Sequence, residues 1–227
     1  KPITIDIQGD KSGGTYRSKA SDIWRYIVCN RGPQPLTDPT DIDDTAFDTA
    51  AADVTTAVGI DYAGDITIAE VGNFLLSGVG LSSWFQRDGG LLTIQRFEGV
   101  AAKTAVLALT EQDIELGTFE PLDAGAPIWA IDLGWKKNSL VHSTTDVAAA
   151  VIGTTRWPFM LLEWRIVGAN DPSVRETYKG ARKMVIETGI GTWAEASAEA
   201  QRRLTLYANP PQAFRGFFRE RATQLDR

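Results

Sequence analysis

The sequence contains very few of the residues from which metal and catalytic sites are usually built. Among its 227 residues there is one cysteine, Cys29, and one histidine, His142. A single cysteine excludes a disulfide within the chain, and it excludes a metal site made only of thiolates, because such sites need several cysteines. A Ser–His–acid relay would have to be built on His142 alone.

The sequence also lacks a long hydrophobic run. The longest apolar runs, 147–152 and 159–162, are short, whereas a helix that crosses a membrane needs about twenty apolar residues. The chain opens at Lys1 and not at a methionine, and residues 3–7 alternate like a strand rather than forming the apolar core of a secretory signal. We therefore predict no membrane span, and we expect the chain to be a portion of a longer protein.

Positive charge is in deficit, with 23 Lys and Arg against 29 Asp and Glu and a net charge of −6. An acidic chain lacks the basic surface of a general nucleic-acid-binding protein, and it repels phosphates and anionic membranes. Apolar residues make up 43% of the chain and charged residues 23%. These are the proportions of an ordinary globular protein, and they exclude a chain that is disordered throughout.

Short strand-like and helix-like patterns follow one another without a regular βαβ rhythm, which predicts an α+β fold with mainly antiparallel sheets. The predicted strands are 3–7, 83–87, 91–97, 105–109, 116–120, 127–135, 165–167, 183–187 and 213–219. The predicted helices run from Ser18 or Ser21 to Asn30, from Asp43 or Asp44 to Ala50 or Val54, from Ile68 to Gly78 or Gly80, and over 146–152, 172–180 and 193–207. Pro158 opposes a continuous helix between 152 and 164.

Local chemistry sets several of these boundaries. The segments 67–70 and 192–195 have the Thr-x-x-Glu pattern of a capping box, and Asp171 followed by Pro172 is a typical helix start. Asp-Gly-Gly at 88–90 predicts a hairpin turn, because glycine tolerates positive φ. Gly-Val-Ala-Ala at 99–102 is the best candidate for a boundary between two domains. We predict either two α+β domains, 1–99 and 100–227, or one continuous unit.

The titratable residues give no convincing site. His142 lies in the polar segment 138–143, where Ser139 or Ser143 is a nucleophile only if folding places it correctly, so a loop histidine is the simpler interpretation. The acidic cluster Asp38, Asp41, Asp43 and Asp44 lacks the glycine and the later glutamate of a calcium loop. Helix capping and a solvated loop, or a weak cation contact, account for it. The glycine pairs lack the P-loop and Rossmann patterns. We predict no catalytic residue, no metal ligand and no cofactor, and hence no enzyme.

Aromatic residues are more informative. Trp24, Phe74 and Trp84 fall on predicted core faces, and Trp129 and Trp135 share one face of their strand with apolar neighbours. Further aromatic residues crowd the C-terminal half, and adjacent Phe217 and Phe218 on a strand must point to opposite faces. These residues are either core or contacts to another chain. The candidate interface residues are Trp157, Phe159, Phe214, Phe217 and Phe218.

The order of several segments resembles a family of virion structural proteins encoded in the tail modules of tailed bacteriophages and prophages. More loosely, it resembles the trimeric hub proteins at the distal end of phage tails. The segments are Ile-Thr-Ile-Asp-Ile-Gln-Gly-Asp at 3–10, Ile-Asp-Asp-Thr-Ala-Phe at 42–47, Val-Gly-Ile-Asp-Tyr at 58–62, the capping box at 67–70, Ser-Gly-Val-Gly at 77–80, Trp-Phe-Gln-Arg-Asp-Gly at 84–89, Leu-Gly-Trp-Lys-Lys-Asn at 133–138 and Ala-Glu-Ala-Gln-Arg-Arg-Leu at 198–204. Residues 146–164 do not match the family pattern.

The resemblance implies a hub-like α+β fold and a structural role without catalytic residues. It implies a homo-oligomer, with a trimer favoured, and contacts with other tail proteins. The location would be the virion tail, with assembly in the cytoplasm of the host bacterium. DNA would be cargo passing through a channel, and an acidic lining would avoid holding its phosphates.

A carbohydrate-active enzyme or a sugar-binding module that uses exposed tryptophans and paired carboxylates is the alternative function. A cleft lined by tryptophan with two carboxylates about 5–10 Å apart would favour this alternative. A flat apolar face without a pocket would favour assembly.

The lack of a ligand cluster with usable spacing generates a first prediction. Melting of the chain should give the same midpoint with and without EDTA, because no metal contributes to its folding free energy. A fall of several degrees on chelation would contradict this, and residues 38–44 would then be the first segment to test.

Overall fold

The computed structural model describes residues 16–31, 34–60, 66–87, 89–98, 110, 113–115, 117–122, 125–209 and 213–217. The predicted strands 3–7 and 105–109 and the candidate interface residue Phe218 lie outside these residues. The described residues form a mixed α+β fold with six α-helices and three small sheets, which are mostly antiparallel. None of the helices in these ranges has the length and apolar content that crossing a membrane requires.

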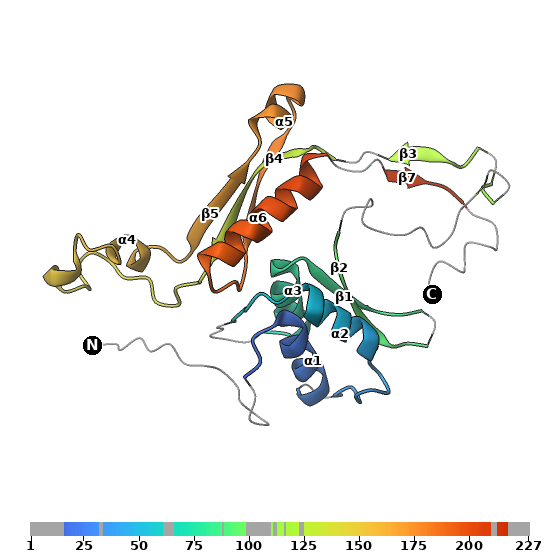
Figure 1. The fold of residues 1–227 in the computed structure, drawn as a ribbon, viewed down its shortest axis with the longest axis horizontal. Helices are drawn as coiled ribbons and strands as arrows, with labels where there is room; N and C mark the ends of the chain where they lie inside the picture. The colour runs from blue at the N-terminus through green and yellow to red at the C-terminus, as the bar shows by residue number, and fades with distance from the viewer. Residues whose placement is uncertain are drawn as a thin grey trace.

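Three helices and a hairpin form the N-terminal part of the described fold (Figure 1). They are α1 (Ala20–Asn30), α2 (Asp44–Asp53), α3 (Ile68–Gly78) and the antiparallel pair β1 (Leu81–Phe85) and β2 (Leu92–Arg96). This confirms the three predicted helices and the predicted hairpin. Gly89 and Gly90 have positive φ in its turn, as expected for residues without a side chain.

Side-chain caps begin most of the helices as predicted. The Asp43 carboxylate accepts the Ala46 N–H at 3.1 Å, and Thr67 with Glu70 forms the complete capping box. The predicted serine cap of α1 is wrong. The residue at that position is Lys19, whose side chain makes no capping bond. Backbone pairing with residues 57 and 58 fixes the chain before α1 instead, so no side-chain cap is needed.

A three-stranded sheet forms the C-terminal part, in the order β5 (Arg165–Asn170), β4 (Ile128–Trp135), β6 (Arg182–Glu187). β4 is antiparallel to β5 and parallel to β6. Helix α6 (Trp193–Ala208) packs on one face of the sheet, and α5 (Pro172–Thr177) follows β5 (Figure 1). Trp135 is buried as predicted, whereas Trp129 is only half-buried.

Two segments extend away from these parts at opposite sides of the view in Figure 1. One contains the 3-10 turn η2 (Ala149–Val151) and the short helix α4 (Trp157–Met160). The other is a ribbon of β3 (Glu120–Leu122) and β7 (Ala213–Arg215), which pair antiparallel. Both ribbon strands are three residues long, so the predicted bounds 116–120 and 213–219 are wrong.

The predicted helices 146–152 and 172–180 are also shorter in the structure. The Asp146 carboxylate bonds back to the N–H and hydroxyl of Ser143, which favours a turn at 143–146 over a helix start. Gly153, with φ 84°, then follows the 3-10 turn. Helix α5 ends at Thr177, before Gly180, with the Tyr178 N–H bonded to the Val174 carbonyl.

One hydrophobic core contains residues from both sides of the predicted boundary at 99/100. Leu75 and Val79 of the N-terminal part belong to the same buried cluster as Ile190 and Leu204. The backbones also meet directly, because the Gly59 N–H bonds to the Gly189 carbonyl at 2.8 Å. Residue 189 must be glycine here, since an added Cβ would lie 2.4 Å from the Gly59 carbonyl oxygen.

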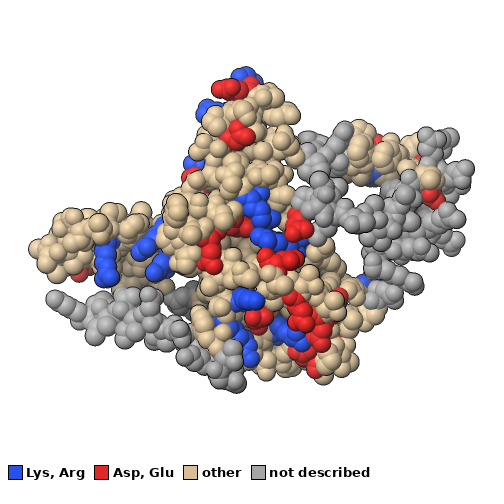
Figure 2. Space-filling view, viewed as in Figure 1, with Lys and Arg blue, Asp and Glu red and all other residues tan. Residues whose placement is uncertain are grey.

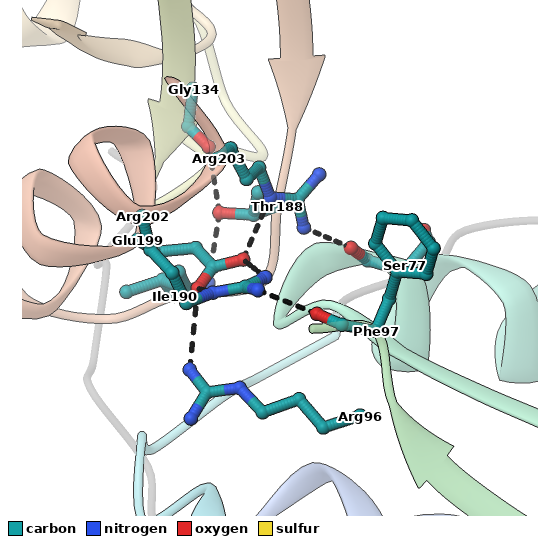
Figure 3. Close-up of polar contacts among 9 residues, drawn as sticks. All are labelled: Ser77, Arg96, Phe97, Gly134, Thr188, Ile190, Glu199, Arg202 and Arg203. Atoms are coloured by element: carbon teal, nitrogen blue, oxygen red, sulfur yellow. Dashed lines mark hydrogen bonds and ion pairs between the residues drawn. The ribbon is translucent and has the colours of Figure 1, made fainter. Parts of the chain in front are cut away.

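A buried carboxylate lies at the junction of the two parts (Figure 3). Glu199 of α6 is only 6% exposed. Arg202 binds both of its oxygens, at 2.7 and 2.6 Å, and the Arg203 Nε donates to Oε1 at 2.7 Å. Arg96 of β2 approaches the same carboxylate at 3.6 Å. A bidentate arginine and two further guanidinium groups supply the charge that a buried carboxylate requires.

The same arginines also bind backbone carbonyls of the N-terminal part. Arg202 donates to the Phe97 carbonyl at 2.7 Å, and Arg203 donates to the Ser77 carbonyl at the end of α3 (Figure 3). In the sequence, Ser77 precedes the hairpin and Phe97 follows it. The Glu199 cluster, defined as Glu199, Arg96, Arg202 and Arg203, therefore fastens α6 to α3 and the hairpin.

The electrostatics of the cluster favour the ionised form of Glu199. Burial raises the pKa of the Glu199 carboxyl, but the hydrogen bonds and charges of Arg202 and Arg203 outweigh burial, so the pKa lies below its ordinary value. A carboxyl with a depressed pKa in the folded state stabilises the fold above its unfolded pKa, about 4.3. That stabilisation is lost as the pH falls through the folded-state pKa.

We predict that Glu199→Gln lowers the free energy of unfolding by about 3–5 kcal/mol at neutral pH, because it leaves buried guanidinium groups without a counter-charge. The variant should also lose part of the fall in stability that the wild type shows below about pH 4.3. Urea unfolding at several pH values measures both effects. The matched control is Glu163→Gln, which removes an exposed ion pair with Lys137 and should cost less than about 1 kcal/mol. Equal losses for the two variants would contradict the prediction.

Candidate assembly surfaces

Exposed large hydrophobic side chains are numerous, and most of them gather in three places. The first is the segment 136–164 around α4, the second is the β3/β7 ribbon with its flanking residues, and the third is the end of the hairpin. The members are Leu140, Val141, Ile152, Phe159 and Leu162 in the first place, Phe119, Leu122, Phe214 and Phe217 in the second, and Trp84 and Phe85 in the third. Monomeric proteins rarely expose extended apolar surface, and where such surface occurs it usually marks an interaction site.

The segment around α4 is held by hydrogen bonds rather than by a core. The Asn138 N–H donates to the Glu163 carbonyl at 2.7 Å, and the His142 N–H donates to the Met160 carbonyl at 2.9 Å. The Arg165 guanidinium lies 4.1 Å from the centre of the Phe159 ring and 5.3 Å from that of Trp135. Figure 2 shows basic residues where this segment joins the body. The segment presents aromatic and aliphatic side chains beside positive charge.

The β3/β7 ribbon carries a stacked aromatic pair. The rings of Phe119 and Phe214 are nearly parallel, with centres 4.9 Å apart. The Phe217 N–H donates to the Thr118 hydroxyl at 3.1 Å, and the Phe217 carbonyl accepts from Glu115 at 2.9 Å. These bonds keep the chain beside β3 after β7 has ended. The ribbon therefore exposes ordered aromatic side chains.

The structure does not bring the predicted interface residues together in one patch. Trp157 and Phe159 belong to α4, whereas Phe214 belongs to β7, and these elements lie at opposite sides of Figure 1. Phe217 lies two residues beyond β7, so the alternation argument that placed it on a strand is wrong. Phe159, Phe214 and Phe217 are exposed and Trp157 is half-buried. Their role as contacts stays a prediction.

An apolar groove of about 470 Å³ lies between α1, α3 and the hairpin. Trp24 and Gly72 form part of its wall, and Trp84 and Phe85 of β1 lie at the hairpin side. The prediction that Trp84 is core is wrong, because its side chain is 45% exposed. Side chains alternate along a strand, so Trp84 lies on the same face of β1 as the exposed Ser82, opposite the face of the buried Leu81. The sequence signal for this surface was the Trp-Phe pair.

The acidic cluster predicted at 38–44 has structural partners, and its member Asp41 accepts the Thr37 N–H at 2.7 Å. Asp38 and Asp44 pair with Arg25, and Asp43 caps α2 and also accepts from Gln86 at 2.9 Å. The Asp38 carboxyl has a lowered pKa because of its hydrogen bond from Arg25. In the described ranges no three His, Cys, Asp or Glu side chains are grouped so that they could hold a metal ion.

The lone histidine has no built relay around it. His142 is half-buried, and its backbone N–H bonds to Met160. The Ser143 hydroxyl donates to the Asp146 carboxylate at 2.5 Å, so it is engaged in the local turn. Among the described residues no hydrogen bond joins the His142 side chain to Ser143 or Asp146, so these three residues are not connected as a Ser–His–acid relay.

No protein-family model and no curated protein matches the sequence.

The contact between Gly72 and the Trp24 ring in the groove wall can be tested by substitution. A Cβ at residue 72 would lie 2.5 Å from the Trp24 ring. We predict that Gly72→Ala lowers the free energy of unfolding by about 1–2 kcal/mol, because overpacking against a buried indole outweighs the better helix propensity of alanine. Gly180→Ala, where nothing lies within 4 Å of the added Cβ, is the control and should change stability by less than about 0.5 kcal/mol. Stabilisation by Gly72→Ala would show that Trp24 moves freely.

Proposed function

We propose that this chain is a structural component of a bacteriophage or prophage tail, in the hub or tip region. It acts by self-assembly and by contacts with other tail proteins. The observation that carries the proposal is the pair of extended aromatic segments at opposite sides of the fold (Figure 1). The order of sequence segments that resembles tail-module proteins supports the tail context, the hub-like fold and the virion as location.

Two separate aromatic surfaces suit a protein with neighbours on both sides. A contact repeated head to tail uses two different surfaces on each copy, and it closes into a ring when the rotation allows. The α4 segment and the β3/β7 ribbon are two such surfaces, and they differ in chemistry. Arg165 lies beside the aromatics of the first and Glu115 beside those of the second. Lys137 and Glu120 already pair with Glu163 and Arg215 of their own surfaces. Opposite charge favours contact between unlike surfaces of two copies.

The resemblance favours three copies in the ring. An acidic chain around a passage for DNA would not retain the phosphates of its cargo. The described residues that line the apolar groove include no carboxylate. The groove therefore does not supply the paired acids of a glycosidase, and we do not extend the carbohydrate alternative.

The test compares the oligomeric state of the wild type with that of Phe159→Glu and Phe214→Glu, measured by light scattering across a concentration series. We predict that the wild type self-associates and that each variant weakens association at least about tenfold, which corresponds to about 1.4 kcal/mol. Tyr178→Glu, at another exposed aromatic, is the matched control and should associate like the wild type. Circular dichroism confirms that each variant folds.

A separate experiment tests the proposed location in the tail. An antibody against the chain should label the tail tip of virions from a strain that produces them, seen by electron microscopy. Labelling of the capsid, or a wild type that stays monomeric alone and with its tail neighbours, would contradict the proposal.

A further inference from the structure

Strand β5 lies at an edge of the sheet and has few of the features that prevent another strand from pairing with it. It forms one edge of the order β5-β4-β6, and in the part of the chain that the structure describes no strand pairs with its outer side. Its residues between Arg165 and Asp171 are Ile-Val-Gly-Ala-Asn, without charge or proline. The opposite edge, β6, carries Arg182, Lys183 and Glu187. Charged residues are a common device against strand addition. β6 carries them at both ends, whereas β5 has one only at its first residue, Arg165.

The hydrogen bonds of β5 determine which of its backbone groups face outward. The Asp171 N–H donates to the Trp129 carbonyl at 2.8 Å, so residue 171 bonds toward β4. In an antiparallel pair, hydrogen-bonded and non-hydrogen-bonded positions alternate along the strand. The odd-numbered residues of β5 therefore bond to β4. The N–H and C=O groups of Ile166, Gly168 and Asn170 point away from the sheet.

We propose that β5 pairs antiparallel with β5 of a second copy of this chain, about a two-fold axis at Gly168. In this register Gly168 faces Gly168 of the second copy, and Ile166 faces Asn170 in both directions. Each of these three facing pairs exchanges two hydrogen bonds, so every outward group of the strand is used. The pairing keeps α6 on the same side of a continuous six-stranded sheet.

Neighbouring registers use fewer groups. An axis at residue 167 pairs Asn170 with Trp164, which lies outside the strand. An axis at residue 169 pairs Ile166 with Pro172, which has no N–H to donate. Only the axis at Gly168 satisfies Ile166, Gly168 and Asn170 together.

Charge selects the same register. With the axis at Gly168, Arg165 of each copy lies directly opposite Asp171 of the other. Opposite charges across two strands stabilise the pairing, and like charges weaken it. The register therefore places one complementary charge pair at each end of the new ladder. The strand is self-complementary both in its hydrogen bonds and in its charges.

The residues at the proposed axis are accessible. Ile166 is 61% exposed, and Gly168 has no side chain to obstruct the approach of another backbone. This contact goes beyond the proposed tail function. A two-fold contact closes with two copies, so it is separate from a head-to-tail contact that builds a ring.

The decisive variant is Gly168→Lys, and its matched control is Val185→Lys. Both residues lie beside Asp132 in the register of the sheet, one on each edge strand, and Val185 is 68% exposed. At residue 168 the two new lysines would face each other across the axis, whereas at residue 185 they would lie on the other edge. A Cβ at residue 168 meets Asp132 Oδ1 at 3.4 Å, an ordinary contact, so the monomer should fold.

We expect sedimentation velocity to show wild-type species with an even number of copies, at least tenfold weaker pairing of copies for Gly168→Lys, and no change for Val185→Lys. Equal effects of both variants would indicate β5-to-β6 pairing and overturn the proposal. A wild-type trimer insensitive to Gly168→Lys would overturn it while leaving the proposed self-assembly intact. A monomeric wild type would also overturn it.

A disulfide cross-link tests whether Gly168 faces Gly168 of the second copy, even if the lysine variant does not fold. In a Cys29→Ser background, Gly168→Cys should form a disulfide-linked dimer on mild oxidation. Facing Cα atoms of a hydrogen-bonded pair are about 5.5 Å apart, within the range of a disulfide. Val185→Cys in the same background should stay monomeric on a non-reducing gel. Linkage of Val185→Cys in place of Gly168→Cys would contradict the two-fold axis at β5.

Discussion

The ionised carboxylate of Glu199 is the interaction on which the arrangement of the whole fold depends. A buried carboxylate is costly unless charged donors surround it, and here three arginines from two parts of the chain do so. Two of them also bind carbonyls at Ser77 and Phe97, on either side of the hairpin. One side chain of α6 therefore orients the sheet relative to α3 and the hairpin, and the shared core around Leu75 and Ile190 closes beside it.

The core extends from the N-terminal helices across this junction to the sheet, and the extended segments receive little cover from it. The segment around α4 is held by backbone bonds from Asn138 and His142, and the ribbon by the pairing of β3 with β7 and the stacked Phe119 and Phe214. Such segments keep a shape but cannot bury their own apolar side chains. This division between a fixed junction and exposed aromatic extensions is the physical basis for proposing an assembly protein.

The two edges of the main sheet differ in how readily another strand could pair with them. Lys183 on β6 pairs with Asp132 at 2.5 Å and keeps charge along that edge. The residues of β5 after Arg165 are uncharged, and three of its backbone positions face outward. The assembly surfaces thus fall into two physical kinds. Aromatic surfaces act through burial, which tolerates small shifts, and a strand edge acts through hydrogen bonds, which fix a register.

Local chemistry in the sequence determined the helix starts at Asp43, Thr67 and Asp171 and the hairpin turn at Gly89, because caps and turns involve residues only a few positions apart. Tertiary structure decided the rest. Glu199 and Arg203 are visible in the sequence as an i,i+4 pair on a helix, yet their partners Ser77 and Arg96 lie more than a hundred residues away. Trp84 fell on an apolar pattern but is exposed, because a two-stranded hairpin buries only one face. The separation of Trp157 from Phe214 likewise depends on where α4 and β7 leave the core, which no local pattern records.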